Sequence, residues 1–171
     1  MVEVVISVVL VGGLLVASLH LVAAAAGSDR MLQNVSRGQT LAEELLTEIT
    51  RKAYEDPDDA PVFGREAGEL AVTRSAFDDV DDYNGWSSSP PQAADGTPLS
   101  AFADWTRQVR VRWVTLGDPE VLSLAESGVK RIDVQVKDPA GRLLGQATAL
   151  RTKAGDVINA DPGVPIDWQT P

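Results

Sequence analysis

The sequence predicts an α+β protein in which a long N-terminal helix packs on a small antiparallel β-sheet. An apolar run passes into an amphipathic helical pattern, and three later segments alternate apolar and polar residues as half-buried strands do. The apolar faces of the helix and the sheet can cover each other. The 171 residues divide into a transmembrane helix half (1–28), an amphipathic helix half (29–55), an acidic loop region (56–104), an antiparallel sheet (105–152) and an irregular tail (153–171).

The first half of the helix is predicted to span a membrane. From Val4 to Ser28 no residue carries a formal charge, and most are Val, Leu, Ile or Ala. At about 1.5 Å per residue this run covers about 37 Å, more than the hydrocarbon core of a bilayer. A cleavable signal peptide is the alternative, since the alanines at 23–26 could mimic a cleavage site. The run is too long for the apolar core of such a signal, and no basic residue precedes it.

Four residues of this apolar helix are candidate assembly determinants. Glu3 places a carboxylate at the edge of the span, which costs about 2–3 kcal/mol unless the side chain reaches the headgroups or finds a cation. Both outcomes are open from the residues alone. Gly12 and Gly13 weaken a helix, and Gly13 with Ala17 has the small-xxx-small spacing that lets membrane helices approach closely.

The second half of the helix has one apolar face. Apolar or small residues recur every three or four positions after Ser28, opposite a polar face, as in a helix that lies against a sheet. Asp56-Pro57 is expected to end it, so a continuous helix is predicted from about Val4 to Tyr54, about 77 Å long. The residues of the predicted buried stripe are Met31, Val35, Gly38, Ala42, Leu45, Ile49 and Ala53, thickened by Leu32, Leu41 and Leu46.

The loop region is strongly acidic. Residues 55–82 hold ten acids and two bases, so they supply −8 of the formal charge of −10. Such a surface repels phosphate backbones, and we expect no nucleic-acid partner. Phe77, Tyr83 and Trp86 are expected to anchor the loop. Its cluster of Asp78, Asp79, Asp81 and Asp82 could bind calcium, which prefers several carboxylate oxygens, although a solvated acidic surface loop is the favoured interpretation and the EF-hand spacing fails.

The C-terminal segments predict a three-stranded sheet. Val109, Val111 and Trp113 alternate with polar residues, and so do Ile132, Val134 and Val136. A turn at 138–141 is expected to join the second strand to a third at 143–150, forming a hairpin. Between the first two strands, residues 116–128 are expected to form a loop with a short helical turn at Pro119–Ala125.

No set of residues that catalysis needs is visible in the sequence. There is no cysteine, and the one histidine, His20, lies in the apolar run. Neither a nucleophile–histidine pair nor a zinc site can be assembled from these residues, and no glycine-rich phosphate loop occurs. We therefore predict that the protein is not an enzyme and needs no cofactor, with calcium as the one candidate ion.

The segment Val2–Leu10 (VEVVISVVL) resembles the start of mature type IV pilins and type II secretion pseudopilins, which begin Phe-Thr-Leu-Val/Ile-Glu and continue as a long apolar helix. Glu3 falls on the family's glutamate and Met1 on the Leu two residues before it. Residues 77–86 and 128–132 are also similar to segments of pilin-like proteins that carry a prepilin-type N-terminus. The resemblance implies a long helix on a small antiparallel sheet. It also implies that Glu3 neutralises the N-terminal amine of a neighbouring subunit during assembly.

The function that this resemblance implies is that of a minor pseudopilin-like structural subunit of a type II secretion or type IV pilus apparatus. Its implied partners are other pilin or pseudopilin subunits, the inner-membrane assembly platform, membrane lipid and, if a leader exists, a prepilin peptidase. It would span the inner membrane once, with the C-terminal domain in the periplasm.

One feature departs from the family pattern. The family has a basic leader ending in Gly, followed by Phe, and the sequence contains neither, so we expect the true start to lie upstream of Met1. Two alternatives remain open: a minor pilin for adhesion or DNA uptake, and a signal-anchored periplasmic binding module.

Overall fold

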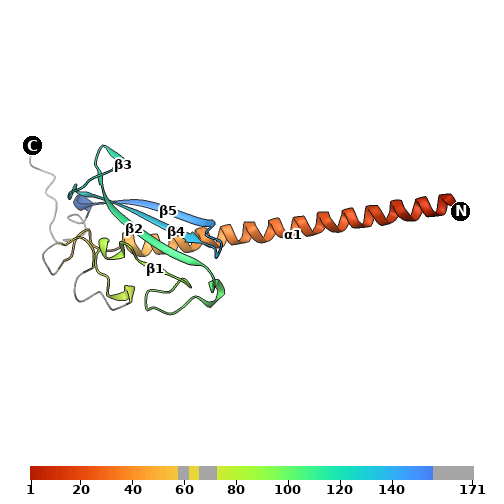
Figure 1. Ribbon diagram of the computed structural model, residues 1–171. Helices are drawn as coiled ribbons and strands as arrows, with labels where there is room; N and C mark the ends of the chain where they lie inside the picture. The colour runs from red at the N-terminus through yellow and green to blue at the C-terminus, as the bar shows by residue number, and fades with distance from the viewer. Residues whose placement is uncertain (58–61, 66–72, 156–171) are drawn as a thin grey trace, which may run out of the picture.

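The computed structural model describes residues 1–57, 62–65 and 73–155, apart from the side chains of residues 24–28. In this part of the chain a long helix and an antiparallel sheet give an α+β architecture, which confirms the predicted class (Figure 1). The elements are α1 (Val2–Thr50), the 3-10 turns η1 (Arg74–Ala76), η2 (Asp81–Tyr83) and η3 (Ser100–Phe102), and the strands β1 (Ser87–Ser88), β2 (Thr106–Thr115), β3 (Asp118–Leu122), β4 (Val129–Lys137) and β5 (Leu143–Thr152).

Helix α1 is continuous over 49 residues, as the unbroken pattern predicts. Its N-terminal half projects away from the rest of the molecule, which we call the head (Figure 1). The helix ends at Thr50, four residues before the predicted end at Tyr54. The reason is that Ala53 bonds to another segment: its N–H donates to the Asp78 carbonyl, and its carbonyl accepts the Val80 N–H. These two bonds replace the helical ones, and Tyr54 turns into the core at 1 % exposure.

The predicted apolar stripe of α1 is buried only in its second part. Leu41, Ala42, Leu45 and Ile49 are buried, together with Gly38. The prediction is wrong for the three residues nearer the N-terminus, since the head does not reach them and nothing in the described chain covers them. Their exposed fractions are 36 % for Met31, 68 % for Leu32 and 38 % for Val35.

The sheet has the strand order β1-β2-β4-β5, and β3 pairs with the far end of β2. All of these pairings are antiparallel. The three predicted strands are confirmed as β2, β4 and β5, and the expected hairpin turn closes with a bond from the Gly141 N–H to the Asp138 carbonyl. The sheet side of the core consists of Val109, Val111, Ile132, Val134, Val136, Leu144 and Ala147, which pack on the buried part of α1.

The predicted helical turn at Pro119–Ala125 is wrong. Asp118–Leu122 forms β3, which makes a hairpin with the end of β2. The Thr115 hydroxyl donates to the Asp118 carbonyl at 2.8 Å, and the Ser123 N–H donates to the Trp113 carbonyl at 2.9 Å. Since β2 extends to Thr115, its unpaired edge groups offer the following residues a partner, and this pairing outweighs a weak local helical tendency.

The loop region is held by aromatic side chains, as predicted. Phe77, Tyr83 and Trp86 are 1 %, 0 % and 9 % exposed, and the rings of Phe77 and Tyr83 meet edge to face with centroids 5.0 Å apart. Of the predicted irregular tail only residues 153–155 lie within the described part, where they form a short helical turn.

Helix and sheet approach most closely at two glycines. A Cβ added to Gly38 of α1 would lie 2.6 Å from Cβ of Leu144 and 2.8 Å from its carbonyl carbon. A Cβ added to Gly145 of β5 would clash with the backbone of Gly38 and Gln39. Backbone therefore meets backbone here, and neither position has room for a larger residue.

Gln39 adds a hydrogen-bonded connection at the same place. Its Nε2 donates to the Gln146 carbonyl at 3.1 Å, and its Oε1 accepts the Gln146 N–H at 3.2 Å. Both bonds use main-chain groups of β5 at the edge of the sheet, where unpaired groups would otherwise be free to pair with another chain. The side chain of one helical residue thus fixes the register of α1 on β5.

Replacing Gly38 with Ala is expected to destabilise the head by about 1–3 kcal/mol, because overpacking forces helix and strand apart. Thermal unfolding of the full chain in detergent, followed by near-UV circular dichroism, measures the effect as a fall of several degrees in the melting temperature. Gly117→Ala is the matched control, since an added Cβ there meets nothing within 4 Å. Equal melting temperatures for the two variants would show that the close contact at Gly38 does not restrict the size of the residue there.

Candidate functional site

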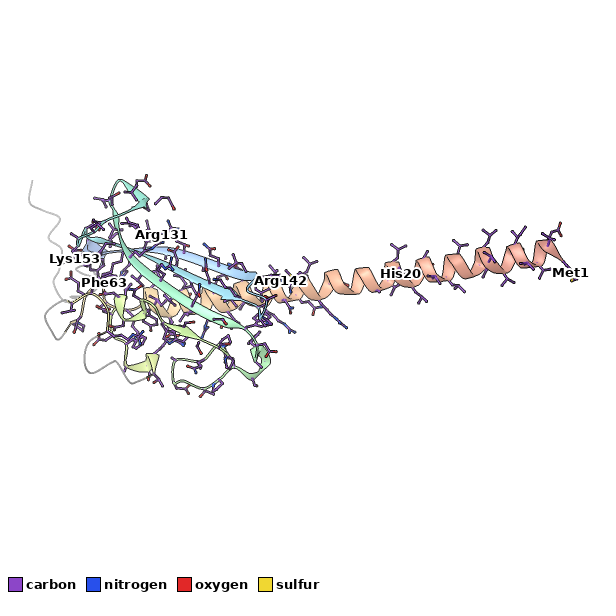
Figure 2. The ribbon with its side chains drawn as sticks, viewed as in Figure 1. Met1, His20, Phe63, Arg131, Arg142 and Lys153 are labelled. Carbon is purple, nitrogen blue, oxygen red and sulfur yellow. The ribbon has the colours of Figure 1, made fainter. Side chains whose placement is uncertain are left out.

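The exposed half of α1 is the most unusual surface of the described chain. Val2–Ala23 has a mean hydropathy of 2.5 over 22 residues, and none of it is buried. Figure 2 shows its side chains standing free from Met1 past His20, with the head far from them. By length and composition this helix can cross a membrane. It needs either lipid or other helices around it.

Glu3 lies in the first turn of this helix and is fully exposed. The Ser7 hydroxyl bonds to the backbone carbonyl of Glu3 at 2.8 Å and leaves the carboxylate untouched. Among the described residues, that carboxylate has no hydrogen-bond or ion-pair partner. It borders a shallow groove along one face of the helix, lined by Glu3, Val4, Ser7, Val8, Val11, Gly12 and Leu15.

The three predicted packing residues lie on the same exposed segment. A Cβ added to Gly12 or Gly13 would meet nothing within 4 Å, and Ala17 is exposed. The helix runs straight through both glycines without a break. Their small size therefore serves no contact within the described chain, and close packing against a second helix stays a prediction.

An ion pair between the buried Arg74 and the partly buried Glu48 fixes the head end of α1. Glu48 receives two parallel bonds from Arg74, Nε to Oε1 at 3.0 Å and Nη2 to Oε2 at 3.1 Å, and a third from the Tyr83 hydroxyl at 3.0 Å. Burial alone would raise the pKa of Glu48, but these three donors outweigh it and lower the pKa below its ordinary value. Paired bonds of this kind fix orientation as well as distance.

A second buried arginine extends the same network. Arg107 Nη1 donates to the Leu41 carbonyl of α1 at 3.3 Å, and its Nη2 and the guanidinium of Arg74 both bond to the Gln92 carbonyl. Burial and the nearby Arg74 lower the pKa of Arg107 to about 10. The loop region, the sheet and the helix are therefore joined by charged groups as well as by the apolar core.

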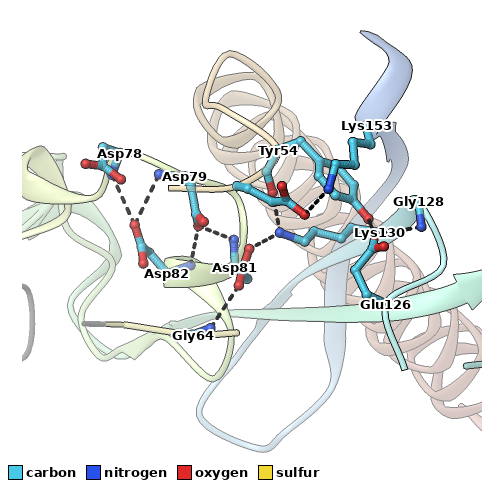
Figure 3. Close-up of polar contacts among 11 residues, drawn as sticks. Tyr54, Gly64, Asp78, Asp79, Asp81, Asp82, Glu126, Gly128, Lys130 and Lys153 are labelled. Atoms are coloured by element: carbon cyan, nitrogen blue, oxygen red, sulfur yellow. Dashed lines mark hydrogen bonds and ion pairs between the residues drawn. The ribbon is translucent and has the colours of Figure 1, made fainter. Parts of the chain in front are cut away.

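The acidic cluster is buried, which corrects the interpretation of a solvated surface loop. Asp79, Asp81 and Asp82 are 2 %, 2 % and 1 % exposed, and only Asp78 is partly open to solvent. Asp79 Oδ1 accepts the N–H groups of residues 81 and 82, and Asp82 Oδ2 accepts those of residues 78 and 79 (Figure 3). The carboxylates thus bind the backbone of their own turn.

Lys130 of β4 supplies the counter-charge. Its Nζ, on a side chain 3 % exposed, bonds to Asp81 Oδ1 and to the Tyr54 carbonyl (Figure 3). Asp81 Oδ2 also accepts the Gly64 N–H at 2.9 Å. Burial and the nearby carboxylates raise the pKa of Asp79 to about 8. Lys130 offsets one carboxylate of the cluster, and the raised pKa of Asp79 favours its protonated form near neutral pH.

Calcium binding at Asp78, Asp79, Asp81 and Asp82 stays an untested prediction. In the described residues no three or more of these or other His, Cys, Asp or Glu side chains converge as metal ligands do. To bind calcium, the cluster would have to give up the N–H donors that now hold its turn together.

The sequence interpretation missed the buried cations Arg74, Arg107 and Lys130. For two of them a signal was present. Arg107 precedes Val109 and Val111 at the inward-facing positions of β2, and Lys130 precedes the inward-facing residues of β4 in the same way. Alternation therefore places both charges on the core side of the sheet.

Comparison of the chain with models of known protein families, with characterised proteins and with solved structures found no match. Conclusions about function therefore depend on the chain's own residues and their geometry.

Replacing Asp79 with Asn is expected to remove a pH dependence of stability while keeping the oxygen that accepts the two N–H bonds. In the unfolded chain Asp79 loses its proton near pH 4, but in the folded chain only near pH 8. The folded state binds more protons over that range, so wild-type stability falls as pH rises from about 4 to about 8. The variant should melt progressively higher than wild type across this window. Thermal unfolding of both proteins at several pH values measures this. A difference in melting temperature that stays constant from pH 4 to pH 8 would contradict the raised pKa of Asp79.

Proposed function

We propose that this chain is a pilin-like structural subunit, a minor pseudopilin-like component of a type II secretion or type IV pilus apparatus. The observation that supports this most is the exposed apolar half of α1, which carries the unpartnered carboxylate of Glu3 at its tip and continues without a break into the head. Such a helix supplies both a membrane anchor and a surface for lateral packing against helices of other subunits. In this proposal the head lies in the periplasm.

Glu3 acts as a register device in this proposal. A carboxylate in a low-dielectric environment is costly alone and strongly attracts a cation. The N-terminal ammonium of a neighbouring subunit is such a cation, and it reaches Glu3 only when the two helices are offset by a fixed distance along their axes. The small residues at 12, 13 and 17 would let the helices approach closely enough for that pairing.

The exposed stripe of Met31, Leu32 and Val35 supports the same proposal. These side chains lie between the membrane-spanning segment and the head, where lipid tails do not cover them. Helices of neighbouring subunits, packed side by side over their whole exposed length, would cover them. A membrane anchor that served only to hold the head at the bilayer would have no need of an apolar stripe there.

The second candidate is a membrane-anchored periplasmic binding module. A groove on the outer face of the sheet favours it, because ligands bind in concave sites where polar groups fix their orientation. The two candidates differ at Glu3, which matters for assembly but not for anchoring.

Replacing Glu3 with Val is expected to leave membrane insertion intact and to abolish co-assembly with other pilin-like subunits. Breaking a buried charge pair by removing one partner costs about 3–5 kcal/mol, enough to weaken association at least a hundredfold. The measurement is co-purification of sister subunits from detergent-solubilised membranes, with secretion or piliation of the cells as a second readout.

Glu44→Gln is the matched control. It removes an exposed carboxylate from the same helix outside the span and should change neither readout. Membrane fractionation shows whether both variants still insert. Normal assembly of the Glu3→Val protein would exclude the register role and favour the binding module.

A further inference from the structure

The sheet face that points away from α1 carries a concentration of positive charge. A groove of about 590 Å³ lies over β2 and β4 on this face. Four cations against one carboxylate give its lining a formal charge of +3, in a chain whose formal charge is −10. The charged residues of the lining are Arg110, Arg112, Arg131, Lys137 and Asp133.

Strand pairing places two of these arginines directly opposite each other. Arg112 of β2 faces Arg131 of β4, and like charges opposed across strands destabilise a sheet. Asp133 lies beside both and accepts from Arg112 Nη2 at 2.8 Å and from Arg131 Nε at 3.0 Å. Burial alone would raise the pKa of Asp133, but the two guanidinium groups and the Thr148 hydroxyl outweigh it and hold the pKa below its usual value. The carboxylate of Asp133 is thus ionised, and both of its oxygens already accept hydrogen bonds.

Arg110 and Lys137 are left without a counter-charge. Arg110 is exposed and lies directly opposite Asp133, yet the carboxylate bonds to the other two arginines. Within the described part of the chain, the side chains of Arg110 and Lys137 have no hydrogen-bond or ion-pair partner. Both charges are therefore available to an anion that enters the groove.

The rest of the lining distinguishes between classes of anion. It is mainly amide and backbone, with Gln108 bonded to Gln135 at 3.0 Å on the floor. Of the described lining residues only Trp86 is aromatic. It is 9 % exposed, and the guanidinium carbon of Arg74 lies 4.3 Å from its ring centroid. The groove therefore offers no open ring on which a base could stack, and the acidic remainder of the chain repels a phosphate backbone.

The spacing of the cations matches an extended peptide. Arg110 and Arg112 are two residues apart on one strand, so they repeat at about 6.6–6.8 Å. Side chains on one face of an extended peptide repeat at the same distance. Carboxylates at alternate residues would meet successive guanidinium groups. That of Arg110 can hold a carboxylate by two parallel hydrogen bonds, and that of Arg112 can donate from Nη1 beside its bond to Asp133.

We propose that this groove binds an extended acidic segment of a partner protein, with carboxylates at alternate residues on Arg112 and Arg110 and a further one on Lys137. The site is separate from the assembly helix, because α1 packs on the other face of the sheet. The proposal therefore does not depend on Glu3 or on filament assembly.

The test uses the full chain in detergent micelles and a fluorescent peptide of about ten residues that alternates Glu and Ser, an extended repeat of the required spacing. Anisotropy should report binding that weakens as salt rises, because exposed charge pairs are screened. The matched Gln-Ser peptide should not bind. R110Q and K137Q should each weaken binding about two- to fivefold, and the double variant about tenfold. R51Q, which removes an exposed arginine at the end of α1, should bind as wild type does.

Equal binding of the acidic and neutral peptides would overturn the proposal, as would wild-type affinity in the double variant. An anionic polysaccharide or a single-stranded oligonucleotide that binds more tightly in the same assay would overturn the assignment to a protein segment. Self-association that is lost in the double variant would assign the groove to a second copy of the chain instead. Equal melting temperatures of the variants and wild type would show that any loss of binding is not a loss of fold.

Discussion

The contact between Gly38 and Gly145 sets the geometry of the whole molecule. At this point the backbones of α1 and β5 meet, and the helix continues beyond it without a break. Most of the described side chains N-terminal to the contact are exposed, whereas C-terminal to it one face of the helix is buried in the core, with Leu41, Ala42, Leu45 and Ile49. The direction and the exposed length of the apolar rod are therefore fixed by one close approach. The Gln39 amide fixes the register on the neighbouring main chain.

In the head, some of the acidic residues are buried, while basic residues gather on the outer face of the sheet. Part of the acidic segment turns inward, where Asp81 pairs with Lys130 and burial raises the pKa of Asp79. Arg74 turns inward as well, onto Glu48 of the helix. Buried pairs of this kind add little net stability, but they are costly to break, so they favour one arrangement of loop, helix and sheet. Meanwhile the outer face of the sheet keeps its arginines at the surface. A net charge of −10 thus coexists with a basic face.

Periodicity predicted the parts of the fold that depend on local sequence. The continuous helix, three of the strands and the aromatic anchors of the loop all follow from spacing or from residue type. Two of the misses depend on a partner distant in sequence, whereas β3 pairs with the end of β2 that directly precedes it. The helix ends early because Ala53 bonds to the segment at 78–80. The aspartates are buried because Lys130, some fifty residues later, reaches them. Of the candidate site, Glu3 was found from sequence because its chemistry is local, whereas the basic groove requires the pairing of β2 with β4.

The two proposed surfaces are compatible because they lie on different parts of the molecule, the exposed half of α1 and the outer face of the sheet. Helix α1 covers the inner face, and its exposed rod extends beyond the head, so lateral packing of helices leaves the outer face open to solvent. A ligand in the groove would contact β2 and β4, whose inner faces hold the core against α1. Binding there would not compete with assembly, so one subunit could contact its helix partners and an acidic partner at the same time. Several exposed cations in one groove would act together on that partner, since linked weak contacts reinforce one another.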